Sequence, residues 1–236
     1  MPDISEPVVL VLIGALLNLD KQALGPFLAG RPLVVGLILG LAAGEPVFGI
    51  WLGLSAELLW VAALPLGGEM TPHAGLAVSG AFIAWKISGF APASAWPPSE
   101  MIRATLVVAF LTIPPWAKAM SLIDILGRRL ASSLPARIQA DLARGREPRF
   151  FTRNLYGLAV TLALSAAFLA LAAAVNSLVI RLAVGLAPQA ALFHLSFIFS
   201  LVPFIGLLGL AVFMEAKSFT FYLGGLLAGL LAFCAV

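Results

Sequence analysis

Long uncharged stretches occupy the second half of this chain. No Asp, Glu, Lys or Arg occurs within residues 154–180, 182–214 or 218–236. A helix needs about 20 apolar residues to cross the hydrocarbon core of a bilayer. The three stretches therefore predict membrane-spanning helices, and the longer ones leave room for tilt.

The first half is different, because single charges divide it into shorter apolar runs. These runs cover residues 32–44, 46–56, 58–68, 70–85, 87–99 and 104–117. Short apolar segments interrupted by Gly and Pro are typical of broken or re-entrant helices, which often form binding sites in transporters. The segment Leu64 to His73 has two prolines and two glycines, which predicts non-helical backbone there. An ordinary loop outside the membrane is the alternative interpretation of this segment.

The composition sets the fold class. The chain has 236 residues, of which 61% are hydrophobic and 11% are charged, whereas a soluble domain has about 25% charged residues. We therefore predict an all-α integral membrane protein, a polytopic helical bundle with broken or re-entrant helices in the N-terminal half. The length allows about six to eight crossings, so residues 1–236 are predicted to form a single transmembrane domain.

Basic residues gather in one segment near the middle of the chain. Seven arginines lie between residues 128 and 153, against Asp141 and Glu147. Because Lys and Arg are enriched in cytoplasmic loops, residues 118–153 are predicted to be a cytoplasmic, basic, amphipathic loop of a multi-pass membrane protein. Apolar residues spaced three and four apart predict a surface helix that Pro135 stops. A cytosolic partner is one candidate for docking there.

Glycines recur every fourth residue in two neighbouring stretches. Gly36, Gly40 and Gly44 form the first series, and Gly49 and Gly53 the second. Such spacing places small residues on one face of a helix and lets two helices approach closely. The pattern predicts helix packing and carries no chemistry by itself.

Glu57 is the first candidate for a functional residue. It lies within residues 46–68, which are otherwise uncharged. A carboxylate at membrane depth costs about 2.5–3.5 kcal/mol on insertion scales, so it must be paired, protonated or facing a polar cavity. We expect it to line a path for a polar substrate; a structural tie to a neighbouring helix is the alternative. Trp60, three residues later, is expected either to anchor the protein at the interface or to stack on a substrate ring.

Four more residues are candidates for the same path. Asp20 and Asn18 share one turn after the first apolar run, and Glu69 and His73 lie in the Pro- and Gly-rich segment. A solvated helix end is the alternative for Asp20. His73 is expected to line a path or loop, because the only other histidine is distant and no Cys/His cluster suggests a metal site. We find no motif for a cofactor or for a catalytic residue on this chain.

The residues also resemble a known family. Arg31-Pro32-Leu33, the glycine-rich segment after it, and Gly67 to Ala77 (GGEMTPHAGLA) are similar to the IIC component of the mannose/sorbose-type sugar phosphotransferase system. The residues that fall on positions of the family pattern are Arg31, Pro32, Gly40, Gly44, Gly49, Gly53, Glu57, Pro72, Leu76 and Ala77. Phe221 to Gly224 also resembles the C-terminal Phe-Tyr-Leu-Gly of the family.

The resemblance implies a membrane subunit that carries a hexose or amino sugar across a bacterial inner membrane together with a IID membrane partner. Soluble IIA and IIB proteins would relay phosphate to the sugar, so no phosphorylated residue is expected on this chain. A homo-oligomer of the IIC/IID unit is the implied assembly. Glu57 would accept hydrogen bonds from sugar hydroxyls, with Asp20, Asn18, Glu69, His73 and Trp60 as further contacts.

One departure from the family pattern affects the expected substrate. The family has Asp after its Ala-Pro, whereas this chain has Thr71-Pro72-His73. A changed polar group in the pocket alters which sugar fits, or whether transport is retained. Two alternatives therefore stay open: a proton-coupled or vitamin-type transporter, and a non-transporting scaffold that keeps the fold.

Overall fold

A computed structural model describes residues 5–20, 27–60, 72–90, 100–147, 149–188 and 191–202. Helices are the only regular elements in these ranges, which confirms the predicted all-α class. The helices are α1 (Ser5–Leu19), α2 (Pro32–Ala42), α3 (Pro46–Trp60), α4 (Ala74–Ile87), α5 (Glu100–Ala119), α6 (Leu122–Ala131), α7 (Ser133–Ala143) and α8 (Phe150–Gly185). One more helix covers Ala191–Val202.

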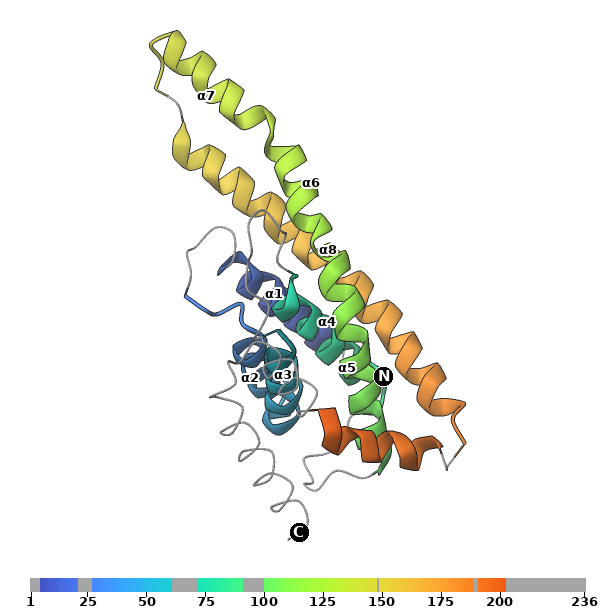
Figure 1. Ribbon diagram of the computed structural model, residues 1–236. Coiled ribbons are helices and arrows are strands. Elements are labelled where there is room, and N and C mark those ends of the chain that lie inside the picture. The colour runs from blue at the N-terminus through green and yellow to red at the C-terminus, as the bar shows by residue number, and fades with distance from the viewer. Residues whose placement is uncertain are drawn as a thin grey trace, which may run out of the picture.

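Two helical stretches in the described residues are long and apolar enough to cross a membrane. They are Met101–Ala143, which includes most of α5 and all of α6 and α7, and Phe150–Gly185, which is α8. The stretch from α5 to α7 runs beside α8 in the opposite direction (Figure 1). At about 1.5 Å per residue, α8 is about 54 Å long, well over the ~30 Å of a hydrocarbon core.

Two helices of the N-terminal half are much shorter. Described residues flank α2 and α4 on both sides, and these helices have 11 and 14 residues, whereas one crossing needs about 20. These lengths agree with the prediction of interrupted helices in the N-terminal half. They also explain why the charges of this half lie at helix ends, where each short helix meets a turn or loop.

Helices α2 and α3 form a hairpin whose backbones touch. An added Cβ at Gly36 would lie 2.2 Å from the carbonyl oxygen of Gly49, and one at Gly49 would lie 2.1 Å from that of Gly36. The turn between them uses Gly44 at φ +73, a conformation that glycine adopts without strain. Pro32 begins α2 in the first helical position, where its missing N–H needs no partner.

Helix α4 forms the centre of the bundle. It packs against α1, α2, α5 and α8, and every residue from Ala74 to Trp85 is buried. The Trp85 ring stacks on Phe48, with ring centroids 3.4 Å apart. Trp85 is therefore a core residue of the bundle, packed against a neighbouring aromatic ring.

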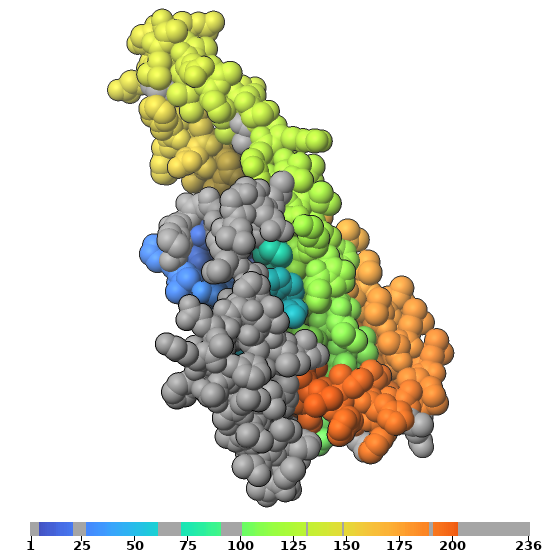
Figure 2. Space-filling view, viewed as in Figure 1, coloured from blue at the N-terminus to red at the C-terminus, as the bar shows by residue number. Residues whose placement is uncertain are grey.

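Helices α6 and α7 and the first turns of α8 form an arm that extends past the bundle (Figures 1 and 2). The helix break falls at Ser132, and Pro135 lies in the first turn of α7. The prediction that Pro135 stops a helix is wrong, because a proline in the first turn removes no intrahelical hydrogen bond. The described part of residues 118–153 is thus mainly helical.

Candidate functional site

The described candidate residues gather at one end of the bundle, where α1 ends and α4 begins. Gly30 links the end of α1 to the start of α4. Its N–H donates to Asp20 Oδ2 at 3.1 Å. A Cβ added to Gly75, at the start of α4, would lie 2.0 Å from the Gly30 carbonyl oxygen. We call this region, defined by Asn18, Asp20, Arg31, Glu57 and His73, the polar end of the bundle.

His73 is the most enclosed member of the polar end. It is 2% exposed, and both ring nitrogens have partners. Nδ1 lies 3.0 Å from Asn18 Oδ1, and Nε2 lies 3.0 Å from Asp124 Oδ1. Asn18 in turn donates from Nδ2 to Ser165 Oγ at 2.9 Å. This chain of four polar side chains joins α1, α6 and α8 to the residue that precedes α4.

With Asp124 ionised, the protons in this chain have two consistent arrangements. With the Asn18 amide nitrogen on Ser165, its oxygen faces His73, which must then donate from both nitrogens as an imidazolium next to Asp124. With the amide turned by 180°, a neutral His73 accepts from Asn18 and donates to Asp124, while Ser165 donates to Asn18. The charge of His73 and the orientation of Asn18 are therefore linked.

Asp20 holds the loop before α2. Its Oδ1 accepts from the Phe27 N–H at 2.9 Å and its Oδ2 from the Gly30 N–H at 3.1 Å. The side chain is buried, so the alternative of a solvated helix end is wrong. The loop contains Leu28 at φ +65, an unfavourable conformation for a leucine. The two hydrogen bonds to Asp20 help to hold the backbone in this conformation.

Glu57 lies three residues before Trp60, the last described residue of α3. Its Oε1 pairs with Arg31 Nη1 at 2.5 Å, and its Oε2 accepts from the Leu33 N–H at 3.3 Å. The carboxylate is therefore tied to the start of α2, and its side chain is 18% exposed while that of Arg31 is 51% exposed. Residues 61–71 lie outside the described part of the chain, so the place of Glu57 in the middle of residues 46–68 stays a prediction.

Of the other candidate residues, Trp60 is half-buried against the core, and Glu69 lies outside the described residues. Lys86 is at the far end of α4, where its Nζ donates to the Ala43 carbonyl at 3.0 Å and pairs with Glu6 at 3.3 Å. Across the described ranges, His, Cys, Asp and Glu form no cluster of three or more that could hold a metal ion.

Sequence reasoning missed two members of the network, Asp124 and Ser165. Asp124 is the one acidic residue of α6, an amphipathic helix that otherwise has basic charges, and this contrast was a usable signal. Ser165 offered none, because a single serine in an apolar helix usually bonds its own backbone. Both residues reach the site through helix packing, which the sequence does not display.

Comparisons with known proteins agree with this architecture. Residues 5–234 match the family model described as the sorbose-specific IIC component of the phosphotransferase system. No curated protein matches the chain. A solved structure described only as a membrane protein has a TM-score of 0.63 at 19% identity, covering 97% of this chain and 87% of that one.

A second solved structure is the cryo-EM complex of the mannose transporter ManYZ with microcin E492. It has a TM-score of 0.53 at 20% identity, covering 97% of this chain and 88% of that chain. At these identities the two structures support the fold alone, whereas the family model covers nearly the whole sequence. The chain belongs to the family of sorbose-specific IIC components, the sugar-specific membrane subunits of phosphotransferase systems.

Proposed function

We propose that the polar end of the bundle lines the path along which this IIC subunit passes a sugar. The observation that carries the proposal is the gathering of Asn18, Asp20, Glu57 and His73 at the ends of short helices. Transporters with interrupted helices place substrate groups at such ends, where backbone and side-chain polar groups are available.

The chemistry of these side chains suits a polyhydroxylated substrate. Carboxylates accept hydrogen bonds from hydroxyl groups, and the amide and imidazole both donate and accept. Within the described residues these groups already have hydrogen-bond or ion-pair partners, so a sugar must replace some of these bonds. The Arg31–Glu57 pair is the most accessible, because half of the Arg31 side chain is exposed. We infer that Arg31 moves aside and Glu57 receives the sugar hydroxyls.

The partners follow from membership of the family. We propose that a IID subunit completes the path in a bacterial cytoplasmic membrane, and that IIA and IIB proteins supply the phosphoryl group from the side on which the arm lies. The excess of arginine in residues 118–153 supports a cytoplasmic position for the arm. Assembly of several IIC/IID units is part of the same proposal.

The test is phosphoenolpyruvate-dependent sugar phosphorylation by membranes that contain this chain with its IID and IIA/IIB partners. We expect Glu57→Gln to abolish activity, because an amide oxygen is a weaker acceptor and carries no charge. Arg31→Gln is the matched variant: it breaks the same ion pair but leaves the carboxylate, so we expect it to keep substantial activity. Full activity in Glu57→Gln, or an equal loss in both variants, would remove Glu57 from the path.

A proton-coupled carrier is the second candidate function. The buried His73–Asp124 pair, at 3.0 Å, is the observation that favours it, because such pairs can hold and release a proton. Uptake that an uncoupler abolishes, and that proceeds without a phosphoryl donor, would support this candidate over the first.

A further inference from the structure

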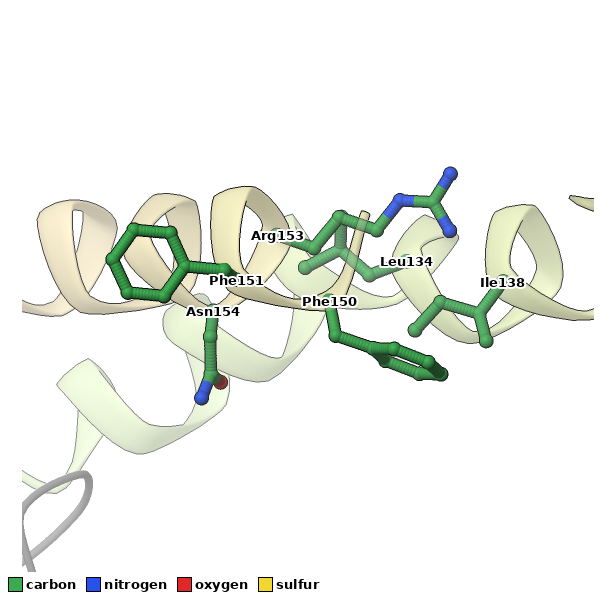
Figure 3. Close-up of a pocket in the computed structure, with 6 residues that line it drawn as sticks. All are labelled: Leu134, Ile138, Phe150, Phe151, Arg153 and Asn154. Carbon is green, nitrogen blue, oxygen red and sulfur yellow. The ribbon is translucent and has the colours of Figure 1, made fainter. Parts of the chain in front are cut away.

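A pocket opens in the arm, away from the polar end of the bundle. It lies between α7 and the start of α8 and has a volume of about 430 Å³. We call it the arm pocket (Figure 3). Its walls are four apolar side chains with one guanidinium and one amide: Leu134, Ile138, Phe150, Phe151, Arg153 and Asn154. Such a lining suits a ligand with an apolar part and an anionic part.

Arg153 supplies the charge of the arm pocket. One nitrogen of its guanidinium, Nη2, pairs with Asp141 of α7, and this ion pair holds the side chain across the gap between α7 and α8. The other nitrogen, Nη1, is buried and has no acceptor among the residues that the structure describes. A buried donor without a partner is unfavourable, so an oxygen of an entering phosphate would complete the group.

The position of Arg153 along α8 places the pocket at a membrane surface. Arg153 and Arg181 border the uncharged residues 154–180. The helical path between them is about 42 Å at about 1.5 Å per residue, which equals the roughly 40–45 Å of a bilayer with its headgroup regions. Arg181 donates to the Ile87 carbonyl at the far end of α4. The two arginines are therefore spaced to reach opposite headgroup levels.

The surroundings of the arm pocket also match a lipid surface. Phe150 is 58% exposed, Phe151 77% and Tyr156 50%, and aromatic residues at the end of a span are typical of the interfacial belt. Residues 118–153 have eight basic and three acidic side chains. An amphipathic, basic segment next to a span is the sequence feature that attracts anionic lipids.

We propose that the arm pocket binds an anionic phospholipid of the membrane. Its phosphate accepts from Arg153 Nη1, and its acyl chains cover Leu134, Ile138 and the exposed Phe150. An acidic segment of a soluble protein has the same charge, but the observations favour lipid: the pocket adjoins an uncharged span at headgroup level, and its walls are mostly apolar. The bound lipid would stabilise the contact between α7 and α8.

The experiment is native mass spectrometry of the full chain in detergent, titrated with dioleoylphosphatidylglycerol or with dioleoylphosphatidylcholine. We expect the Kd for phosphatidylglycerol to be at least about fivefold lower than the Kd for phosphatidylcholine. This is the factor that one arginine near a membrane surface contributes. Arg153→Gln should remove this preference. Arg181→Gln, the matched arginine at the other end of the span, should keep it. Inorganic phosphate in excess should not displace the lipid.

Asp141→Asn separates binding from folding. It weakens the ion pair that Arg153 makes inside the arm and frees the guanidinium, so the preference for phosphatidylglycerol should persist or increase. If Asp141→Asn and Arg153→Gln lose the preference alike, Arg153 has only a structural role and the proposal is wrong. Equal Kd values for the two lipids, or displacement by phosphate, also overturn it. A dimer mass that Arg153→Gln abolishes would overturn the proposal too, because a second copy of the chain would then fill the pocket.

Discussion

The bundle and the arm differ in how closely their residues pack. In the bundle, glycines bring backbones into contact and polar side chains pair with one another: Gly36 touches Gly49, and His73 has a partner on each nitrogen. In the arm, a Cβ added to Gly127 would meet no described atom within 4 Å, and Phe151 is 77% exposed. The helices of the bundle therefore pack closely, whereas the arm has open space around its glycine and aromatic side chains.

This contrast separates two kinds of function. A path for a polar substrate needs polar groups held in fixed positions, and the internal bonds of Asn18, Asp20 and His73 supply that order. An attachment to the surroundings needs exposed apolar and charged groups, which the arm supplies. We therefore assign the proposed transport to the bundle, and contact with membrane or partners to the arm.

The largest change in stability is expected when a methyl group is added within the hairpin of α2 and α3. Gly36→Ala places a Cβ 2.2 Å from the Gly49 oxygen, which only a backbone shift can relieve. We expect the free energy of unfolding to fall by about 3 kcal/mol or more. Gly127→Ala is the control in the arm, and we expect a gain of up to about 1 kcal/mol from helix propensity. Thermal unfolding in detergent measures both, and similar losses at the two sites would contradict the contrast.

The sequence predicted the bundle better in class than in detail. Uncharged runs predicted the long α8 and the short helices before it, and the glycine spacing predicted close packing. Both patterns can be recognised within the sequence of a single helix. The partners of His73 could not be predicted, since Asn18 and Asp124 lie 55 and 51 residues away and meet it only through the packing of three helices.

The second effect is the loss of one polar group from the buried chain. Asn18→Leu removes the partner of both His73 Nδ1 and Ser165 Oγ. We expect the free energy of unfolding to fall by about 2–3 kcal/mol, because buried polar groups are left unpaired. Ser177→Ala is the control, since this exposed hydroxyl bonds its own helix at Ala174, and it should change stability little. Equal, small changes in both variants would mean that water replaces Asn18.

The third effect is the coupling free energy between Arg31 and Glu57, the most accessible pair of the polar end. A double-mutant cycle with Arg31→Gln and Glu57→Gln should give about 1 kcal/mol of coupling, because half of the Arg31 side chain is in contact with solvent. Chemical unfolding of the four proteins measures it. A coupling of several kcal/mol would show a pair too strong to open for a substrate, which would count against the proposed role of Glu57.

The smallest effect is expected from the corresponding pair in the arm. Arg153 and Asp141 join α7 to α8, but these two helices share few other contacts, so breaking the pair loosens a part of the chain on which the bundle does not depend. We expect Asp141→Asn to lower the free energy of unfolding by less than about 1 kcal/mol in detergent. High salt should reduce the difference further, because screening acts strongly on pairs near solvent. Hydrogen exchange should nevertheless rise in α7 while α2 to α4 stay unchanged. A loss of protection in both regions would show that the arm and the bundle unfold as one unit.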